Sequence, residues 1–163
     1  MFDSRAYGEE IANILALDGD GERLMPLVHG DCRTNQAREL VKAAMIAPAT
    51  RAGLYLYFDC WEEAHEAAQD IATPEGSYWH AIVHRREPDA GNSAYWFRQV
   101  GVHAIWGALQ ERATEIGVTS GAHWDAIAFI DYCERARPGS TEERKACEVQ
   151  RAEWQLLFDW CAR

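Results

Sequence analysis

Apolar residues recur at helical spacing along almost the whole chain, and this periodicity restricts the fold more than any other feature of the sequence. Residues three or four positions apart share one face of a helix, whereas a half-buried strand alternates at every second residue. The apolar stripe through Leu54, Phe58 and Trp61 keeps the helical period as far as Ile71, and strand-like alternation is nearly absent elsewhere. We therefore expect an all-α protein, folded as a single irregular bundle of about six or seven helices.

Residues that cap helices indicate where several of these helices begin. Thr34 is an expected N-cap, and Thr73 is followed by a proline and an acid that both suit a first helical turn. Ser120 is expected to open a later helix. The longest helix is predicted to run without interruption over residues 48–71. Because the breaks between helices are short, we expect one domain over residues 1–163.

The charge balance excludes two classes of partner. Lys and Arg total 16 against 26 Asp and Glu, which gives a formal net charge of −10 at pH 7. A surface of that charge repels nucleic acid and anionic lipid headgroups.

The apolar runs fall far short of the roughly 18 residues that a membrane-spanning helix needs. The opening MFDSRAYGEE carries acids where a signal peptide carries basic residues. We expect a cytoplasmic protein with no nucleic-acid and no membrane partner.

The cysteines give no metal or redox signature. Five are present, an odd number, and no two have the C-x-x-C spacing of zinc or redox motifs. Cys147 and Cys161 lie on apolar helical rows, where cysteine acts as a small core residue. Cys60, five positions before His65, is a candidate thiol nucleophile. Packing is the favoured interpretation, because a reactive cysteine needs an electropositive environment.

The block Gly76–Trp106 concentrates the residues that carry chemistry. It holds three of the six histidines, three of the seven tryptophans and three arginines. His80, His84 and Glu87 stand at positions i, i+4 and i+7, so a helix turns two imidazoles and a carboxylate toward one side. The spacing predicts a polar site on the face of one helix.

The preceding helix carries a second polar stripe, through Glu62, His65 and Glu66. If the two helices pack as an antiparallel hairpin, His65 approaches the first stripe, and His103 arrives from a later helix. Three histidines and a carboxylate suit zinc, iron, manganese or nickel. Glu62 and Glu66 are candidates for a general base or for a partner that orients an imidazole. The alternative is that these histidines are buried interface residues that donate to carbonyl or carboxylate groups.

The arginines of the same block support a different site. Forks of Arg85, Arg86 and Arg98, together with Asn92, are expected to bind a small anionic ligand, with the Trp96 ring as one wall. The alternative is that each arginine pairs with a nearby acid or with the end of a helix.

The fragments YWHAIVHRREPD and NSAYWFRQVG, followed by His103, resemble a signature shared by an uncharacterised family of bacterial and fungal proteins. The resemblance implies a shared site at this block and transfers no catalytic residue. Relatives carry proline after the histidine that matches His103, and Ala104 departs from that pattern.

Three functions follow from these patterns. The first is a small helical protein with a pocket lined by His and Glu that binds a metal, with the question of catalysis left open. The second is a non-catalytic module for a small anionic ligand. The third is an acidic subunit that pairs with a partner, or with itself as a homodimer, through a tryptophan-rich face. The sequence contains no Gly-x-Ser-x-Gly elbow, phosphate-binding glycine loop or dinucleotide fingerprint.

Overall fold

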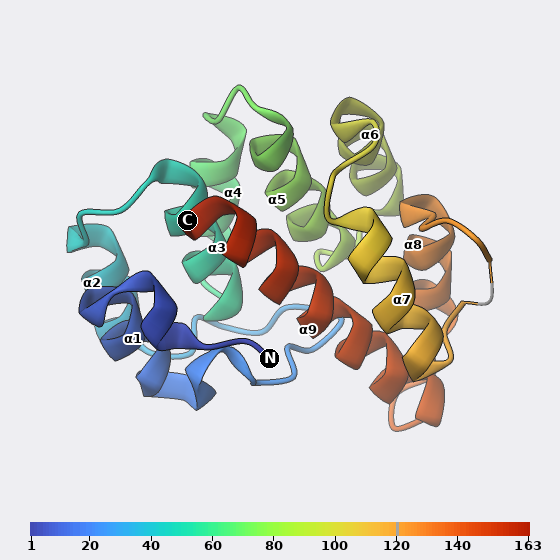
Figure 1. The fold of residues 1–163 in the computed structure, drawn as a ribbon, viewed down its shortest axis with the longest axis horizontal. Coiled ribbons are helices and arrows are strands. Elements are labelled where there is room, and N and C mark those ends of the chain that lie inside the picture. The colour runs from blue at the N-terminus through green and yellow to red at the C-terminus, as the bar shows by residue number, and fades with distance from the viewer. Residues whose placement is uncertain (120) are drawn as a thin grey trace.

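A computed structural model describes residues 1–119 and 121–163, and every regular element within them is a helix (Figure 1). The nine α-helices are α1 (Glu9–Leu15), α2 (Asn35–Ala43), α3 (Pro48–Tyr57), α4 (Trp61–Gln69), α5 (Pro74–Arg85), α6 (Ala90–Val100), α7 (Trp106–Ile116), α8 (Ala126–Arg135) and α9 (Thr141–Ala162). Two short 3₁₀ helices, Ser4–Tyr7 and Ala16–Gly21, flank α1. The all-α class is confirmed, while the described part of the chain holds more helices than the six or seven expected.

The predicted uninterrupted helix over residues 48–71 is wrong. The structure breaks it into α3 and α4 at Phe58, Asp59 and Cys60. Asp59 has a φ of 57°, in the left-handed region that ends a helix. Its carboxylate accepts a hydrogen bond from buried Arg86 at 2.5 Å, so a contact that is distant in sequence holds the turn. The break gives α4 its own direction relative to α3.

The capping predictions agree with the structure where they can be examined. The Thr34 side chain accepts a hydrogen bond from the backbone at the start of α2, and Thr73 does the same for α5. Ser120, expected to open a helix, lies outside the described residues. The helix that follows it, α8, begins after Asp125, whose carboxylate caps the backbone N–H groups of Ile127 and Ala128.

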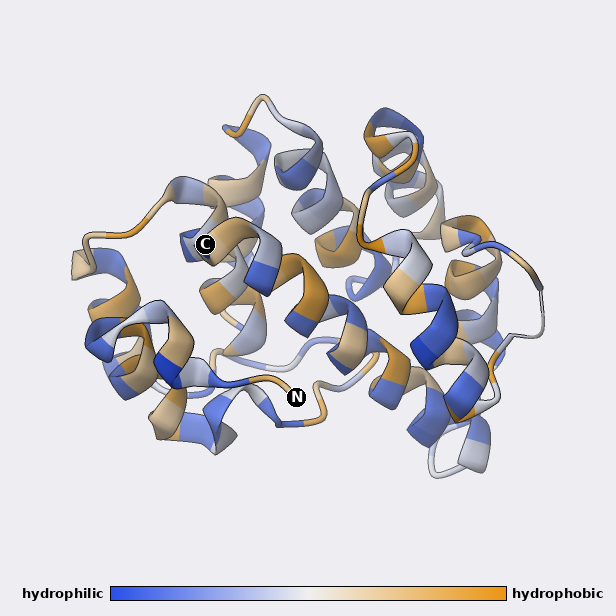
Figure 2. Ribbon diagram, viewed as in Figure 1, coloured by the Kyte–Doolittle hydropathy of each residue, from blue (hydrophilic) through white to orange (hydrophobic). Residues whose placement is uncertain are grey.

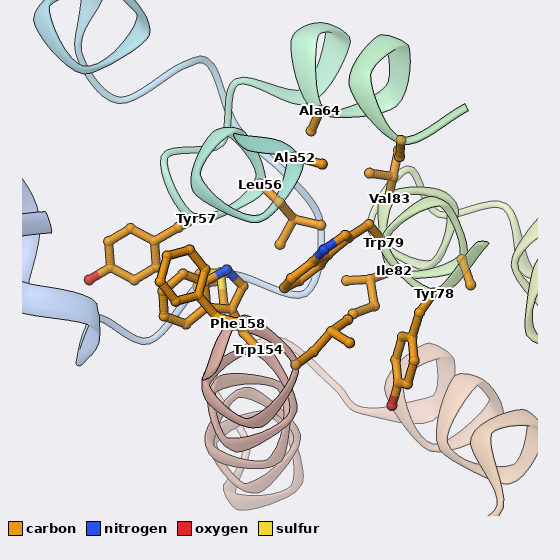
Figure 3. Packing of buried hydrophobic residues seen from close by; sticks show 14 of the residues in the cluster. Ala52, Leu56, Tyr57, Ala64, Tyr78, Trp79, Ile82, Val83, Trp154 and Phe158 are labelled. Carbon is orange, nitrogen blue, oxygen red and sulfur yellow. The ribbon is translucent and has the colours of Figure 1, made fainter. Parts of the chain in front are cut away.

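Helix α9 crosses the other helices and supplies much of the core (Figure 1). Its polar and apolar residues alternate along the helix, as Figure 2 shows. The apolar side is fully buried at Trp154, Leu157 and Phe158. Figure 3 shows Trp154 and Phe158 beside Tyr57 and close to the ring of Trp79. The indole of Trp154 donates to the Gly53 carbonyl at 2.8 Å, so the core joins segments that lie far apart in the sequence.

The tryptophans belong mainly to this interior. Of the seven, only Trp160 is strongly exposed, with 52% of its surface accessible. Trp61, Trp96 and Trp106 are partly buried against the core, and pairing through a tryptophan-rich face stays a prediction from sequence. Among the residues described, no helix combines the length and the apolar character that crossing a bilayer requires.

Cys32 and Cys60 form a disulfide that the sequence analysis did not anticipate. Cys60 is thus not a free thiol, and its candidate role as a nucleophile is corrected. Cys133 is buried, and Cys147 and Cys161 are half-buried, as expected for packing residues. Burial raises the pKa of the Cys161 thiol to about 12, which keeps it protonated at neutral pH.

Candidate metal centre

A tight turn places α4 beside α5. This close approach needs glycine at position 76, in the first turn of α5, because a Cβ there would collide with the Ile71 carbonyl oxygen. The Thr73 hydroxyl caps the first turn of α5 by accepting from the Gly76 N–H. Packed in this way, α4 presents His65 toward the face of α5 that carries His80 and His84.

The three imidazoles converge. Ring centroids of His65 and His80 lie 4.7 Å apart, those of His65 and His84 5.1 Å, and those of His80 and His84 4.8 Å. Each residue offers one ring nitrogen, and the three nitrogens lie within 4.8 Å of one another. Nitrogens that share a metal at about 2.0–2.1 Å stand roughly 3.3 Å apart in a tetrahedral site. A tetrahedral metal would therefore need the three nitrogens to lie closer together than the 4.8 Å limit.

Glu87 orients one of these rings. Its carboxylate Oε2 lies 2.7 Å from Nδ1 of His84. With Nδ1 engaged by this carboxylate, the imidazole keeps Nε2 as the nitrogen available to a metal. Carboxylates in this position orient metal-binding histidines and raise their basicity. Glu87 is therefore placed as a partner of His84 rather than as a direct ligand.

Two tryptophans pack against the cluster. The Trp96 ring stacks on His80 with centroids 4.0 Å apart, and the Trp61 ring stacks on His65 at 5.2 Å. The Trp61 indole also donates to the Val83 carbonyl at 3.0 Å, which ties α4 to α5. From the sequence, Trp61 was expected only as part of an apolar stripe, although its i, i+4 spacing from His65 was a usable signal.

His80 is the most unusual member of the group. It is 4% exposed, and neither Nδ1 nor Nε2 has a hydrogen-bond partner among the residues that the structure describes. Burial, reinforced by repulsion from His84 and His65, lowers the pKa of His80 to about 4. Burial, followed by His84, also lowers the pKa of His65. At neutral pH both rings are uncharged, which is the form that binds metals.

The pKa of His80 predicts how the metal-free protein responds to acid. The folded-state value of about 4 lies below the roughly 6.5 of an exposed histidine. Between these pH values the unfolded chain takes up a proton that the folded chain does not. Stability should therefore fall as the pH drops from about 7 to about 4, by up to about 3 kcal/mol from this residue. Urea unfolding at pH 7, 5.5 and 4.5 measures the loss, which should be smaller in His80→Leu. Equal losses in the two proteins would contradict the prediction.

The other predicted members of the metal site lie elsewhere. Glu62 and Glu66 are exposed, and Glu66 lines a surface hollow beside Arg38 and Lys42 of α2. The structure does not bring either carboxylate into the histidine cluster. His103 is buried in a different setting, with Nε2 3.4 Å from Glu75 and its ring against Tyr78 and Trp160. Sharing a helix flank with His65 was not enough to bring Glu62 and Glu66 to the cluster, and the segment before α7 does not bring His103 there.

The predicted anion pocket does not form from its expected members. Buried Arg85 pairs with Glu153 of α9 at 2.6 Å. Buried Arg86 pairs with Asp59 and donates to two backbone carbonyls. Asn92 donates to Asp89 at the start of α6, and Arg98 is exposed beside a hollow between α6 and α8. Trp96 alone of the set stands at the histidine cluster. The structure thus gives Arg85 and Arg86 the acid pairing named as the alternative.

Two residues near the cluster were missed. Asp89 offers an oxygen within 4.8 Å of ligand atoms of His84 and Glu87, but it also caps α6. His29 comes from the segment that follows α1, and its ring stacks on Trp61 at 5.2 Å. No sequence spacing links His29 to α4, because only the tertiary fold brings them together.

Comparison with known proteins adds no assignment. No family model, curated protein or solved structure matches this chain. The likeness of the histidine block to an uncharacterised family remains a prediction from sequence.

Proposed function

We propose that this protein binds one divalent transition-metal ion through His65, His80 and His84. The observation that carries the proposal is buried His80: within residues 1–119 and 121–163 neither of its ring nitrogens has a hydrogen-bond partner, and one ring nitrogen lies within 4.8 Å of a nitrogen of His65 and of His84. An imidazole that serves packing alone normally has a hydrogen-bond partner, because an unsatisfied buried polar group costs about 1–3 kcal/mol. A metal ion would satisfy one of these nitrogens.

The ligand set favours some metals over others. Imidazole nitrogen suits zinc, nickel, iron and copper, whereas manganese prefers carboxylate, carbonyl and water oxygen. Glu87 is engaged with His84, so the direct ligands are three neutral nitrogens. Of the zinc, iron, manganese and nickel considered from the sequence, we propose zinc or nickel as the best fit and manganese as the poorest.

Three protein ligands leave one position of a tetrahedral ion open. Catalytic zinc sites have this arrangement, and an ion in such a site lowers the pKa of a bound water to about 7. The exposed positions of Glu62 and Glu66 give no support to either as a general base. We therefore propose metal binding and assign no reaction. The anionic-ligand module and the self-associating subunit remain predictions from sequence.

Metal titration of untagged protein tests the proposal. We expect one Zn²⁺ or Ni²⁺ per chain, measured by calorimetry and by elemental analysis after gel filtration. The Glu87→Gln variant should bind the same ion about 10–100-fold more weakly, because outer partners of metal-bound histidines contribute that much to affinity. His123→Ala is the matched control, since His123 is exposed and lies outside the cluster.

Two results would contradict this function. One is a stoichiometry far below one for zinc, nickel, iron and manganese alike, with no shift in melting temperature. The other is an equal loss of affinity in His123→Ala and Glu87→Gln, which would indicate non-specific binding to surface groups.

A further inference from the structure

The segment between the second 3₁₀ helix and α2 lies against the beginning of α4. The backbone N–H of His29 donates to the Arg86 carbonyl at 2.9 Å, and the backbone N–H of Arg33 donates to the Phe58 carbonyl at 2.8 Å. Between these two hydrogen bonds, Cys32 is joined to Cys60. Residues 29–33 are thus fixed by two hydrogen bonds and one covalent bond.

The covalent bond ends next to the histidine site. Cys60 is the N-cap of α4, and the following residue is Trp61. The Trp61 ring stacks on His29 from the tethered segment and on His65 from the metal site, each at 5.2 Å with 19° between planes. One aromatic side chain therefore contacts both the tethered segment and a proposed ligand.

From this arrangement we propose that the Cys32–Cys60 disulfide is a redox control on metal binding at His65, His80 and His84. The inference rests on the proposed function of that site. In the oxidised protein the bond holds His29 against Trp61, and Trp61 in turn orients His65. Reduction releases the tether, so His65 loses part of its support and the ion is bound more weakly.

A dithiol reductant can reduce the Cys32–Cys60 bond by thiol–disulfide exchange. A thiolate of the reductant attacks the sulfur of Cys32, which is half-buried, whereas Cys60 is 1% exposed. Cys60 leaves as a thiolate and takes a proton. The second thiol of the reductant then breaks the mixed disulfide, so the reductant gains a disulfide and the protein gains two thiols.

Access to the bond and its setting both suit such an exchange. Cys32 borders a surface cavity of about 600 Å³ that also reaches Arg23 and Asp59. In the cytoplasm, where the sequence predicts this chain to act, protein disulfides are usually transient and serve catalysis or redox sensing.

The test compares zinc affinity in the two redox states. Oxidised protein is titrated directly, and reduced protein is titrated anaerobically after the dithiol has been removed by gel filtration. Mass spectrometry with a thiol label counts the free cysteines in each sample. We expect Zn²⁺ to bind the reduced protein about 10-fold more weakly, a loss typical of disturbed outer contacts. Cys32→Ala should match the reduced protein under both conditions, and Cys147→Ala should respond to reduction as the natural chain does.

Hydrogen exchange provides a readout that needs no metal. Reduction should increase amide exchange in residues 29–34 and 61–65, and leave α8 unchanged. Equal zinc affinity in both redox states would overturn the redox control and leave the metal site intact. Absence of zinc binding in both redox states would overturn the proposed function. If amide exchange over residues 61–65 were also unchanged on reduction, the role of the disulfide in holding this segment would be overturned as well. Five free thiols in the oxidised sample would also overturn it.

Discussion

Replacing His80 with leucine is expected to weaken zinc binding by more than about 100-fold, since even outer partners of a metal-bound histidine contribute 10–100-fold. The substitution removes the central ligand and leaves only His65 and His84, which cannot hold an ion as a stoichiometric site. Leucine has a similar volume and no polar atom. It replaces a ring whose two nitrogens are buried without partners, so the metal-free variant should be as stable as the natural protein.

Two further histidines make this result specific. His103→Gln removes a histidine that the sequence also predicted as a ligand but that the structure places beside Glu75. It should keep the affinity of the natural protein, as should His123→Ala. Calorimetry with Zn²⁺ measures all three variants, and urea unfolding shows whether each is folded. The assignment fails if His80→Leu binds within 10-fold of the natural chain, or if His103→Gln loses binding to the same extent.

Replacing Arg86 with methionine is expected to reduce the free energy of unfolding by about 3–5 kcal/mol, the range for breaking a buried ion pair on one side. Arg86 is 1% exposed. Its guanidinium donates to Asp59 and to the carbonyls of Pro26 and Leu56. Methionine fills much of the volume but leaves the Asp59 carboxylate buried, with Arg23 at 3.8 Å.

A second substitution separates charge burial from lost packing. In the double variant Arg86→Met/Asp59→Asn the stranded charge is gone, and asparagine tolerates the left-handed backbone of position 59. It should recover part of the lost stability. Arg144→Met is the matched control, because the Arg144–Glu148 pair is exposed and such pairs contribute less than about 1 kcal/mol. Urea denaturation of the four proteins provides the comparison. A loss below 1 kcal/mol in Arg86→Met would show that this pair does not stabilise the fold.

Periodicity was enough to predict the helical class, because it depends on which face of each helix is apolar. It did not reveal the break between α3 and α4. The sequence there keeps its helical period, and the turn is held by the side chain of Arg86 and by a disulfide to Cys32. Both partners come from distant parts of the chain, so no local pattern marks them.

In the candidate site, too, local spacing predicted some contacts, while contacts between residues distant in sequence were missed. The spacing of His80 and His84 placed both imidazoles on one side of a helix, and a hairpin with the preceding helix was enough to add His65. Glu87 was expected on the same helix, but α5 ends at Arg85, and Glu87 contacts His84 from the turn that follows. The arginines could not be placed in this way. The partner of Arg85 is Glu153, 68 positions later, and spacing within one helix does not identify the neighbouring helix that faces it.

The position of α9 in the core has a consequence for synthesis of the chain. Every helix that packs on α9 precedes it, and its Glu153 and Trp154 complete contacts with Arg85 and with the Gly53 carbonyl. A nascent chain that ends before α9 would therefore leave the Trp79 ring and the Arg85 charge without their native cover. We expect the apolar surface exposed in such a chain to bind chaperones on the ribosome. Its cooperative folding must wait until residues 141–162 have emerged from the exit tunnel.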